Sequence, residues 1–442
     1  MSLFGALNTA VSGLSAQSAA FGNISENVAN SQTTGYKEVD THFIDYLTDS
    51  TATDNNPGSV SALPSYTNNV QGTVTQSSDP LAMAISGQGF FAVSETAGTG
   101  STGVTQFNPQ TFYTQAGDFQ MNDSDYLVNG AGQYLQGWTV DPQTGVADQS
   151  VLAPIQITQT QFNPVSTSAI NLAANLPASP SGAPVSSQIQ VYDSLGNAQT
   201  LTLSWAQNTA AGVPVPNDWI VTITSPNNNV VAGVPTPIGT AEVQFGTNGA
   251  PAGTIGSFGA LTGGIGSTTY AAGQPATLTL PTNFGSGSQN INLNLGDFGE
   301  ANGVTQFAGT TYSQGSLSQN GVAPGAFTGI SITTGGAVVA NYNNGQTETV
   351  DQVPITTFSA PDSLQSQNGQ AFTATTNSGN PITQAEDTNG AGSLIIGSVE
   401  SSNVDIATQF SDLIVAQQAY GANAKVVTTA DQLLQVTINM IQ

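Results

Sequence analysis

The sequence predicts a mainly β protein with α-helical termini, in which nested antiparallel β domains of sandwich or barrel type accompany a terminal two-helix coiled-coil domain. The positions of proline indicate where helices can form. All 22 prolines of the 442 residues lie between Pro57 and Pro381. Because proline breaks helix interiors, long helices are favoured at the two ends and not between them.

Apolar side chains at seven-residue spacing predict one helix at each end. The amino-terminal rows are Leu7, Leu14, Phe21 and Val28, interleaved with Leu3, Ala10, Gln17 and Ile24. The carboxyl-terminal rows are Ile406, Leu413, Tyr420, Val427, Leu434 and Ile441, with a companion row that includes Phe410 and Ile438. Such rows are typical of the seams of coiled coils, and we expect the apolar members to carry assembly.

The remaining faces of the amino-terminal helix favour assembly over simple packing on a globular core. Residues 1–36 carry one charged side chain, Glu26. Gly5, Gly13 and Gly22 each cost about 1 kcal/mol in a helix interior, but they let other backbones approach closely. A helix that is small and uncharged all round is better explained by neighbours on several sides than by water. We therefore expect a structural subunit that polymerises through its ends.

Short β-forming segments fill the middle of the chain, separated by turn pairs such as Asn129-Gly130. They include 89–93, 201–205 and 219–223. We expect four parts. They are a terminal coiled-coil domain of 1–29 and 402–442 that forms an inner tube, a connecting segment of 30–70, an inner β domain of 71–147 and 316–401, and an inserted outer β domain of 148–315.

The charge balance excludes several classes of partner. The chain has 27 acidic residues and two cations, Lys37 and Lys425, giving a net charge of −25. Nucleic acid and anionic membrane surfaces are therefore disfavoured, and no apolar run is long enough to predict membrane insertion. We expect both lysines to bind carboxylates after assembly, at least one of them on another copy. The first residues do not resemble a cleaved secretory signal, so the chain stays in the cytoplasm or leaves by another route.

The sequence contains few of the residue types on which catalytic sites depend. Cysteine is absent and His42 is the single histidine. Disulfides, thiolate sites and multi-histidine metal sites are excluded, and a lone histidine is more often structural than catalytic. We expect no enzyme activity, no cofactor and no metal.

The segment after the first helix resembles the signature of the bacterial flagellar rod and hook proteins. It runs from Ala29 to Lys37, and the residues that carry the resemblance are Ala29, Asn30, Thr33, Gly35, Tyr36 and Lys37. At the other end, 402–405, 414–420 and 422–425 are similar to the same family. The family usually has Arg where this chain has Gln418.

Internal stretches narrow the resemblance to hook subunits. The segments 79–91 and 113–119 look like the first β domain that rod and hook proteins share. Val191–Asn197 resembles a motif of the outer domain of hook subunits, and 303–307 and 318–325 look like the return to the inner domain.

The resemblance implies a function that composition cannot give. It implies helical polymerisation into a short, curved, hollow hook, a flexible universal joint that transmits torque from rod to filament. The implied partners are further copies of the chain, flagellar rod and hook–filament junction proteins, the hook cap during assembly and the flagellar type III export apparatus. The implied location is the extracellular part of the flagellum. Two alternatives stay open: a distal rod subunit, and a secreted acidic adhesin or surface protein.

Overall fold

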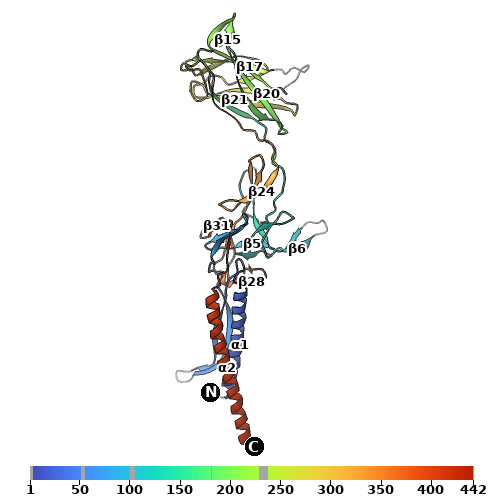
Figure 1. The fold of residues 1–442 in the computed structure, drawn as a ribbon, viewed down its shortest axis with the longest axis vertical. Helices are drawn as coiled ribbons and strands as arrows, with labels where there is room; N and C mark the ends of the chain where they lie inside the picture. The colour runs from blue at the N-terminus through green and yellow to red at the C-terminus, as the bar shows by residue number, and fades with distance from the viewer. Residues whose placement is uncertain are drawn as a thin grey trace. The chain divides into compact units, whose positions relative to one another are not determined.

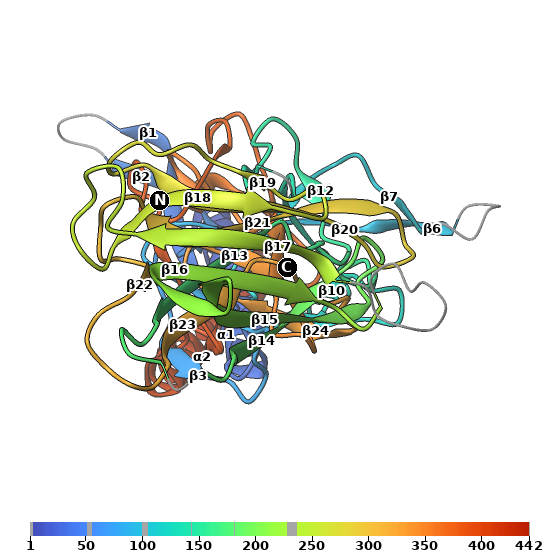
Figure 2. The ribbon, with the colours of Figure 1, turned by 90° about the horizontal axis from the view of Figure 1, so that it is seen from above.

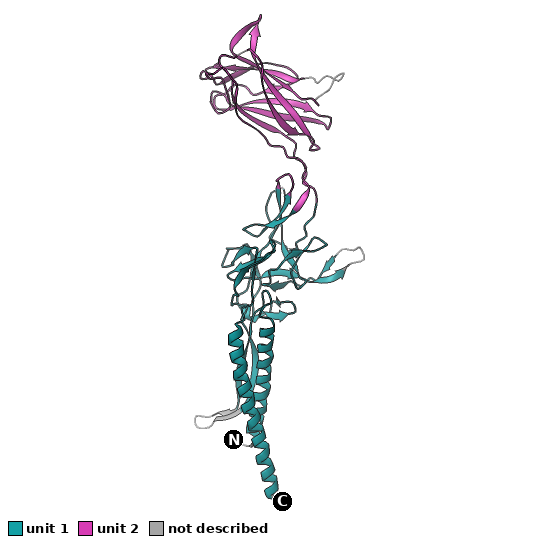
Figure 3. Ribbon diagram, viewed as in Figure 1, with its two compact units in different colours: residues 1–159, 329–341, 347–442 teal, residues 160–328, 342–346 magenta. Residues whose placement is uncertain are grey.

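The computed structural model describes residues 3–50, 55–99, 105–142, 144–180, 182–227 and 237–441. It divides into two compact units (Figure 3). Unit 1 comprises residues 1–159, 329–341 and 347–442, and unit 2 comprises 160–328 and 342–346. Unit 2 is thus inserted into the chain of unit 1, so that both ends of the chain belong to unit 1.

The two ends form helices that lie side by side in unit 1, α1 (Leu3–Ala29) and α2 (Ile406–Ile441) (Figure 1). They run antiparallel, and because α2 has 36 residues and α1 has 27, α2 extends past the start of α1. Asp405 caps α2, since its Oδ1 accepts hydrogen bonds from the backbone N–H groups of Ala407 (2.8 Å) and Thr408 (3.2 Å).

The segment expected to be a connection contains a long antiparallel hairpin of β1 (Val39–Ser50) and β2 (Asn55–Tyr66). The hairpin lies along α1. Thr9 Oγ1 donates to the carbonyl of Gly58 (2.9 Å), and the Val60 N–H donates to Ser12 Oγ (3.1 Å). The serines and threonines of α1 therefore bond a strand, which covers a second side of this helix.

The rest of unit 1 is built around a branched sheet. Its strands, in spatial order, are β24 (Phe327–Ile332), β25 (Ala337–Tyr342), β26 (Thr347–Gln352), β11 (Tyr134–Thr139), β5 (Phe91–Ser94), β8 (Phe112–Thr114), β29 (Ala371–Thr373) and β28 (Gln365–Gln367). Beside β11 lie β10 (Leu127–Val128) and β12 (Ala153–Pro154), and β9 (Gln120–Met121) pairs with β10. Four two-stranded pairs and a 3-10 turn complete it: β3 (Val74–Gln76) with β32 (Ser398–Glu400), β4 (Met83–Ser86) with β31 (Ser393–Ile396), β6 (Thr96–Thr99) with β7 (Thr105–Phe107), β27 (Ile355–Thr357) with β30 (Ile382–Gln384), and η1 (Pro361–Ser363).

Unit 2 is a sandwich of two sheets. One contains β19 (Gly266–Ser267), β20 (Pro275–Asn283), β21 (Ser288–Asp297), β13 (Ala169–Asn175), β22 (Val304–Thr305) and β23 (Ser313–Gln319). The other, whose strands lie side by side in Figure 2, contains β14 (Val185–Tyr192), β15 (Ala198–Ala210), β16 (Val213–Thr224), β17 (Pro237–Phe245) and β18 (Ile255–Leu261). Alternate residues of β15–β17 point inward, and Trp205, Trp219 and Phe245 are almost fully buried between the sheets.

One strand departs from the antiparallel expectation. β13 pairs in parallel with β21 and with β22, and antiparallel with β23. The chain leaves β13, builds the entire five-stranded sheet, and then forms β19 and β20 before it reaches β21. Such a long crossover permits parallel pairing, which a short hairpin does not.

Residues 148–159, expected at the start of the outer domain, lie in unit 1. β12 pairs with β11, and the Ile155 and Ile157 side chains are fully buried there. The backbone N–H of Ile157 also donates to the carbonyl of Asp125 (2.8 Å). Apolar burial and backbone pairing therefore hold this segment in unit 1.

Candidate assembly surface

The contact between α1 and α2 is made largely by small side chains. On α1 the buried positions include Ala10, Gly13, Ala16, Ala20 and Ile24. On α2 they are Gln409, Ala416 and Ala430. Small residues recurring at three- and four-residue intervals let the two helix axes approach closely.

Three contacts set the register of the two helices. A Cβ atom on Gly13 would lie 2.8 Å from Asn423 Nδ2, so the helices are close where Gly13 faces that amide. The rings of Phe21 and Tyr420 meet edge to face with centroids 6.1 Å apart. Near the end of α1, Asn27 Nδ2 donates to Gln409 Oε1 (3.1 Å).

The candidate seam residues divide between the helix contact and the surface. Ile24 is buried, and the partly buried members are Leu7, Leu14, Phe21, Val28, Leu413, Val427 and Leu434. Four members are more exposed: Ile406 (40%), Tyr420 (41%), Phe410 (53%) and Ile438 (55%). The side chains of Leu3 and Ile441 lie outside the described residues.

The row of α2 that accompanies Leu413 and Tyr420 against α1 is not the expected companion row. It contains Gln409, Ala416 and Asn423, whereas Phe410 lies one residue further round the helix and points to the surface. Asparagine and glutamine are polar and alanine is only weakly apolar, so apolar periodicity does not reveal the row that contacts α1 within the chain.

Much of the remaining surface of α2 is apolar. Besides the exposed seam residues, its exposed large side chains are Ile414 (55%), Val415 (64%), Val426 (43%), Leu433 (56%), Val436 (55%) and Met440 (81%). Its charged residues are Asp412, Lys425 and Asp431. In a helix that contacts water on this side, such a surface is unfavourable.

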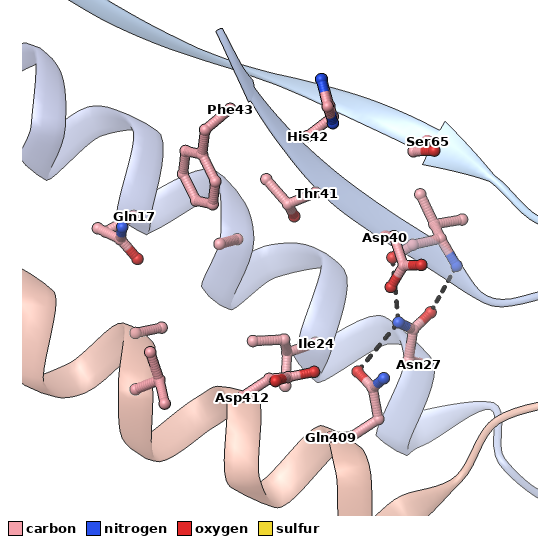
Figure 4. A pocket seen from close by; sticks show the side chains of 14 residues that line it. Gln17, Ile24, Asn27, Asp40, Thr41, His42, Phe43, Ser65, Gln409 and Asp412 are labelled. Atoms are coloured by element: carbon pink, nitrogen blue, oxygen red, sulfur yellow. Dashed lines mark hydrogen bonds between the residues drawn. The ribbon is translucent and has the colours of Figure 1, made fainter. Parts of the chain in front are cut away.

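A groove of about 430 Å³ lies between α1, α2 and the β1–β2 hairpin (Figure 4). Ile24 and Val415 contribute apolar surface, and Asp40 and Asp412 contribute carboxylates. Phe43 of β1 is 42% exposed and lies over α1 in Figure 4. The groove therefore mixes apolar and polar side chains, His42 among them, and is acidic at the end where β1 begins.

The candidate family motif forms the turn after α1. Ala29 is the last residue of α1. Asn30 Nδ2 donates to the carbonyl of Glu26 (3.0 Å), and Thr33 Oγ1 donates to Asn30 Oδ1 (3.2 Å). Gly35 has φ +68°, and a Cβ atom there would lie 2.5 Å from the backbone nitrogen of Ala116. A side chain at this position would be both strained and obstructed.

Tyr36 connects this turn to the two helices. Its hydroxyl donates to Asn27 Oδ1 (3.0 Å), and Asn27 also exchanges hydrogen bonds with the backbone of Val39. Burial, reinforced by the charges of Glu26 and Glu38, raises the pKa of the Tyr36 phenol. The phenol thus stays protonated and acts as a hydrogen-bond donor.

Lys37 forms a buried ion pair with Glu400, with Nζ 2.6 Å from Oε1 and side chains that are 2% and 1% exposed. Lys37 Nζ also donates to the carbonyl of Val70 (2.7 Å), and the N–H of Gly72 donates to the same Glu400 oxygen (2.7 Å). Burial lowers the pKa of Lys37, while Glu400 opposes that shift. This cluster ties three distant segments of one chain together.

The carboxylate partner of Lys37 is therefore Glu400 of the same chain. The sequence predicts a carboxylate partner for Lys37 but does not identify which residue supplies it. Glu400 is 363 residues away, and no periodicity marks it. Lys425 is exposed, and the Lys37–Glu400 pair is the one salt bridge within the described part of the chain.

Other chemical sites are not evident in the part of the chain that the structure describes. Neither α1 nor α2 is both long and apolar enough to cross a membrane. Among the described residues, no three or more His, Asp or Glu side chains gather as metal ligands.

Four family models match successive parts of the chain. Residues 7–37 match "Flagella basal body rod protein" and 84–204 match "Flagellar hook protein FlgE/F/G D1 domain". Residues 163–322 match "Flagellar basal body protein FlaE D2 domain", and 396–440 match "Flagellar basal body rod FlgEFG protein C-terminal". These matches define the class as the structural proteins of the flagellar rod and hook.

Full-length relatives identify the family within that class. The flagellar hook protein FlgE of Brucella abortus biovar 1 (strain 9-941) is 31% identical over 448 residues, with all of each chain covered. That of Salmonella typhimurium (strain LT2) is 28% identical over 450 residues, with 98% of each chain covered. The crystal structure of Helicobacter pylori flagellar hook protein FlgE2 aligns with a TM-score of 0.47 and 14% identity, over 74% of this chain and 100% of that one. The chain belongs to the family of the flagellar hook protein FlgE.

This membership confirms the resemblance drawn from the sequence. The matches that span the chain from end to end carry the name of the hook protein. The alternatives of a distal rod subunit and of an adhesin are therefore not favoured.

Proposed function

We propose that this chain is the structural subunit of a bacterial flagellar hook, which polymerises helically into a curved, hollow tube and transmits torque from rod to filament as a flexible joint. One observation carries the proposal. α2 packs one side on α1 and leaves large apolar side chains such as Ile414 and Val415 exposed. Neighbouring copies would cover these side chains and gain the free energy of apolar burial.

The seam residues are assigned to two kinds of contact in this proposal. Partly buried residues such as Leu14 and Leu413 join α1 to α2 within a subunit and complete their burial against others. Exposed residues such as Phe410 and Ile438 serve neighbours alone. The extension of α2 beyond the start of α1 supports this role, since no residue of α1 lies beside its last turns.

The domain roles follow from the same division. Residues 1–29 and 402–442 would line the inner tube, and the β domains would surround it. A sheet surface of Asn, Gln, Ser and Thr suits wet, weakly specific contacts that slide as the joint bends. Torque would pass from the β domains to the helices through the turn that Lys37 and Glu400 hold.

The proposed partners are further copies of this chain, together with rod, hook–filament junction and hook-cap proteins and the flagellar export apparatus. Export by that apparatus places the polymer outside the cell without a cleaved secretory signal. The proposed role is structural, with no enzyme activity. The family membership supports each of these assignments.

The test compares two substitutions that each introduce an aspartate at an exposed apolar position. Ile414→Asp changes the side of α2 that does not contact α1. Val213→Asp changes a side chain that is 66% exposed, in a hairpin of unit 2. We expect both proteins to be folded by circular dichroism. Val213→Asp should form curved tubes by electron microscopy, whereas Ile414→Asp should stay monomeric. Tubes from Ile414→Asp at wild-type concentrations would overturn the proposal.

A further inference from the structure

Three carboxylates gather at the acidic end of the groove between the helices and the hairpin. Asp40 of β1 and Asp412 of α2 line the groove, and Glu38, directly before β1, lies close enough to both for their charges to act on it. Gln409 Nε2 donates to Glu38 Oε1 (2.6 Å). Burial, followed by the charges of Asp40 and Asp412, raises the pKa of Glu38 to about 6. Within the chain, these like charges repel one another, and no salt bridge joins them to a cation among the described residues.

The composition leaves few side chains that could neutralise them. Arginine is absent, so the candidates are the two lysines and His42, which lines the groove but forms no salt bridge with these carboxylates among the described residues. Lys37 is already buried against Glu400. Lys425 is exposed and has no salt bridge among the residues that the structure describes.

Lys425 cannot reach the groove of its own chain. It lies 13 residues after Asp412 on one continuous helix. At 1.5 Å per residue, this spacing separates the two along the helix axis by about 20 Å. Lys425 also projects from the side of α2 opposite the row of Ala416 and Asn423, since nine residues after Ala416 correspond to two and a half turns.

We propose that Lys425 of one copy docks at the acidic end of the groove of a second copy, where it neutralises Glu38, Asp40 and Asp412. This inference rests on the proposed function and names a contact within it. The charges are complementary, and the groove between the helices and the hairpin is open at about 430 Å³. Gly421, Ala422 and Thr428 flank Lys425 and are exposed, so the helix surface around the ammonium is small enough to enter a groove.

The contact is heterologous, because one surface carries the lysine and a different surface carries the carboxylates. Repetition of such a contact propagates a polymer and does not close a dimer. The same copy then donates Lys425 to one neighbour and receives the lysine of another. This is the geometry that helical assembly requires.

The first experiment compares two single substitutions of equal charge change. Lys425→Gln removes the cation, and Gln432→Glu adds one negative charge to the same side of α2, seven residues further on. Sedimentation measures the monomer concentration that remains in equilibrium with polymer. We expect Lys425→Gln to raise it roughly tenfold, the effect of losing one partly buried ion pair, and Gln432→Glu to change it by less than about threefold. Equal effects of the two substitutions would overturn the assignment to Lys425.

The second experiment reverses both charges. Lys425→Glu and Asp412→Lys should each assemble poorly alone, because like charges then meet at the contact. An equimolar mixture should assemble, since each variant supplies the partner that the other lacks, and so should the doubly substituted chain. A mixture that remains as monomeric as its components would contradict a contact between copies.

The inference can fail separately from the proposed function. If Ile414→Asp blocks assembly while Lys425→Gln assembles like wild type, the apolar contact stands and the lysine contact is wrong. If Ile414→Asp also assembles normally, the helix surface is not the assembly surface and both are wrong.

Discussion

The sandwich of unit 2 and the helical pair of unit 1 differ in how much apolar surface a single chain covers. In the sandwich, Trp205 and Trp219 are 0% and 1% exposed between two complete sheets. In the helical pair, Ile414 and Val415 are 55% and 64% exposed on a helix that has few charges. The sandwich therefore has the core it needs within one chain, whereas we propose that the helices acquire theirs from neighbours. On this proposal, the difference separates a part that folds from a part that assembles.

The largest effect on stability should come from a cavity in the core of the sandwich. Trp205→Ala removes a fully buried aromatic side chain, and we expect it to lower the free energy of unfolding by about 3–5 kcal/mol. Ser204→Ala, at the neighbouring and outward-facing position of β15, should change it by less than about 0.5 kcal/mol. Urea unfolding followed by circular dichroism measures both. Similar values for the two variants would mean that the sandwich does not stabilise itself in this way.

The two lysines allow a buried charge and an exposed charge of unit 1 to be compared by their effects on monomer stability. Glu400→Gln leaves the Lys37 ammonium buried without its carboxylate, and we expect the monomer to lose about 3 kcal/mol of stability. Lys425→Met should leave monomer stability unchanged, because Lys425 is exposed in a single chain. Thermal unfolding of the monomers distinguishes them. A stable Glu400→Gln protein would contradict the role of the buried pair as the tie between the helices and the β strands.

Two glycines of α1 test the close helix contact. Gly13→Val places a branched side chain where Asn423 lies 2.8 Å away, and we expect a loss of about 1–3 kcal/mol. Gly22→Ala meets nothing within 4 Å and should stabilise the helix by up to about 1 kcal/mol. The helical signal in circular dichroism during denaturation reports both. Loss of helix in Gly22→Ala would argue against the observed register.

The smallest effect concerns how the stability of the sandwich depends on pH. Burial, and then Glu242, raises the pKa of Asp218 to about 6, above the value of about 3.9 of an unfolded chain. A raised carboxyl pKa stabilises the folded state in acid, and this contribution is lost as the pH rises from about 4 through 6. Asp218→Asn should remove that part of the pH dependence and add on the order of 1 kcal/mol at pH 7. An unchanged stability profile between pH 4 and 7 would contradict the assignment.

The sequence could predict the elements that rest on strong apolar or proline patterns. The seven-residue rows that contain Leu14 and Leu413 predict the two helices. The alternation at 201–205 and 219–223 predicts strands β15 and β16. The turn from Ala29 to Lys37 was found through its resemblance to a family, and its geometry explains the glycine through Ala116. Local pattern was sufficient in these cases because each signal lies within a few residues.

The features that were missed depend on distant or weakly apolar partners. The β1–β2 hairpin has no strict alternation, since it is stabilised by hydrogen bonds with Ser12 and Thr9 of α1. Gln409 and Asn423 pack against α1 although they are polar. The fold brings Glu400 to Lys37, and no sequence pattern around Glu400 indicates this ion pair.

The central claim is that the terminal helices are stabilised by neighbouring copies, while the sandwich is not. Hydrogen exchange of the monomer and of the assembled tube tests this directly, because it reports the stability of each segment. We expect 3–29 and 406–441 to exchange rapidly in the monomer and to become strongly protected in the tube, while β15–β17 are protected equally in both. Helices that are as protected in the monomer as in the tube would contradict the account.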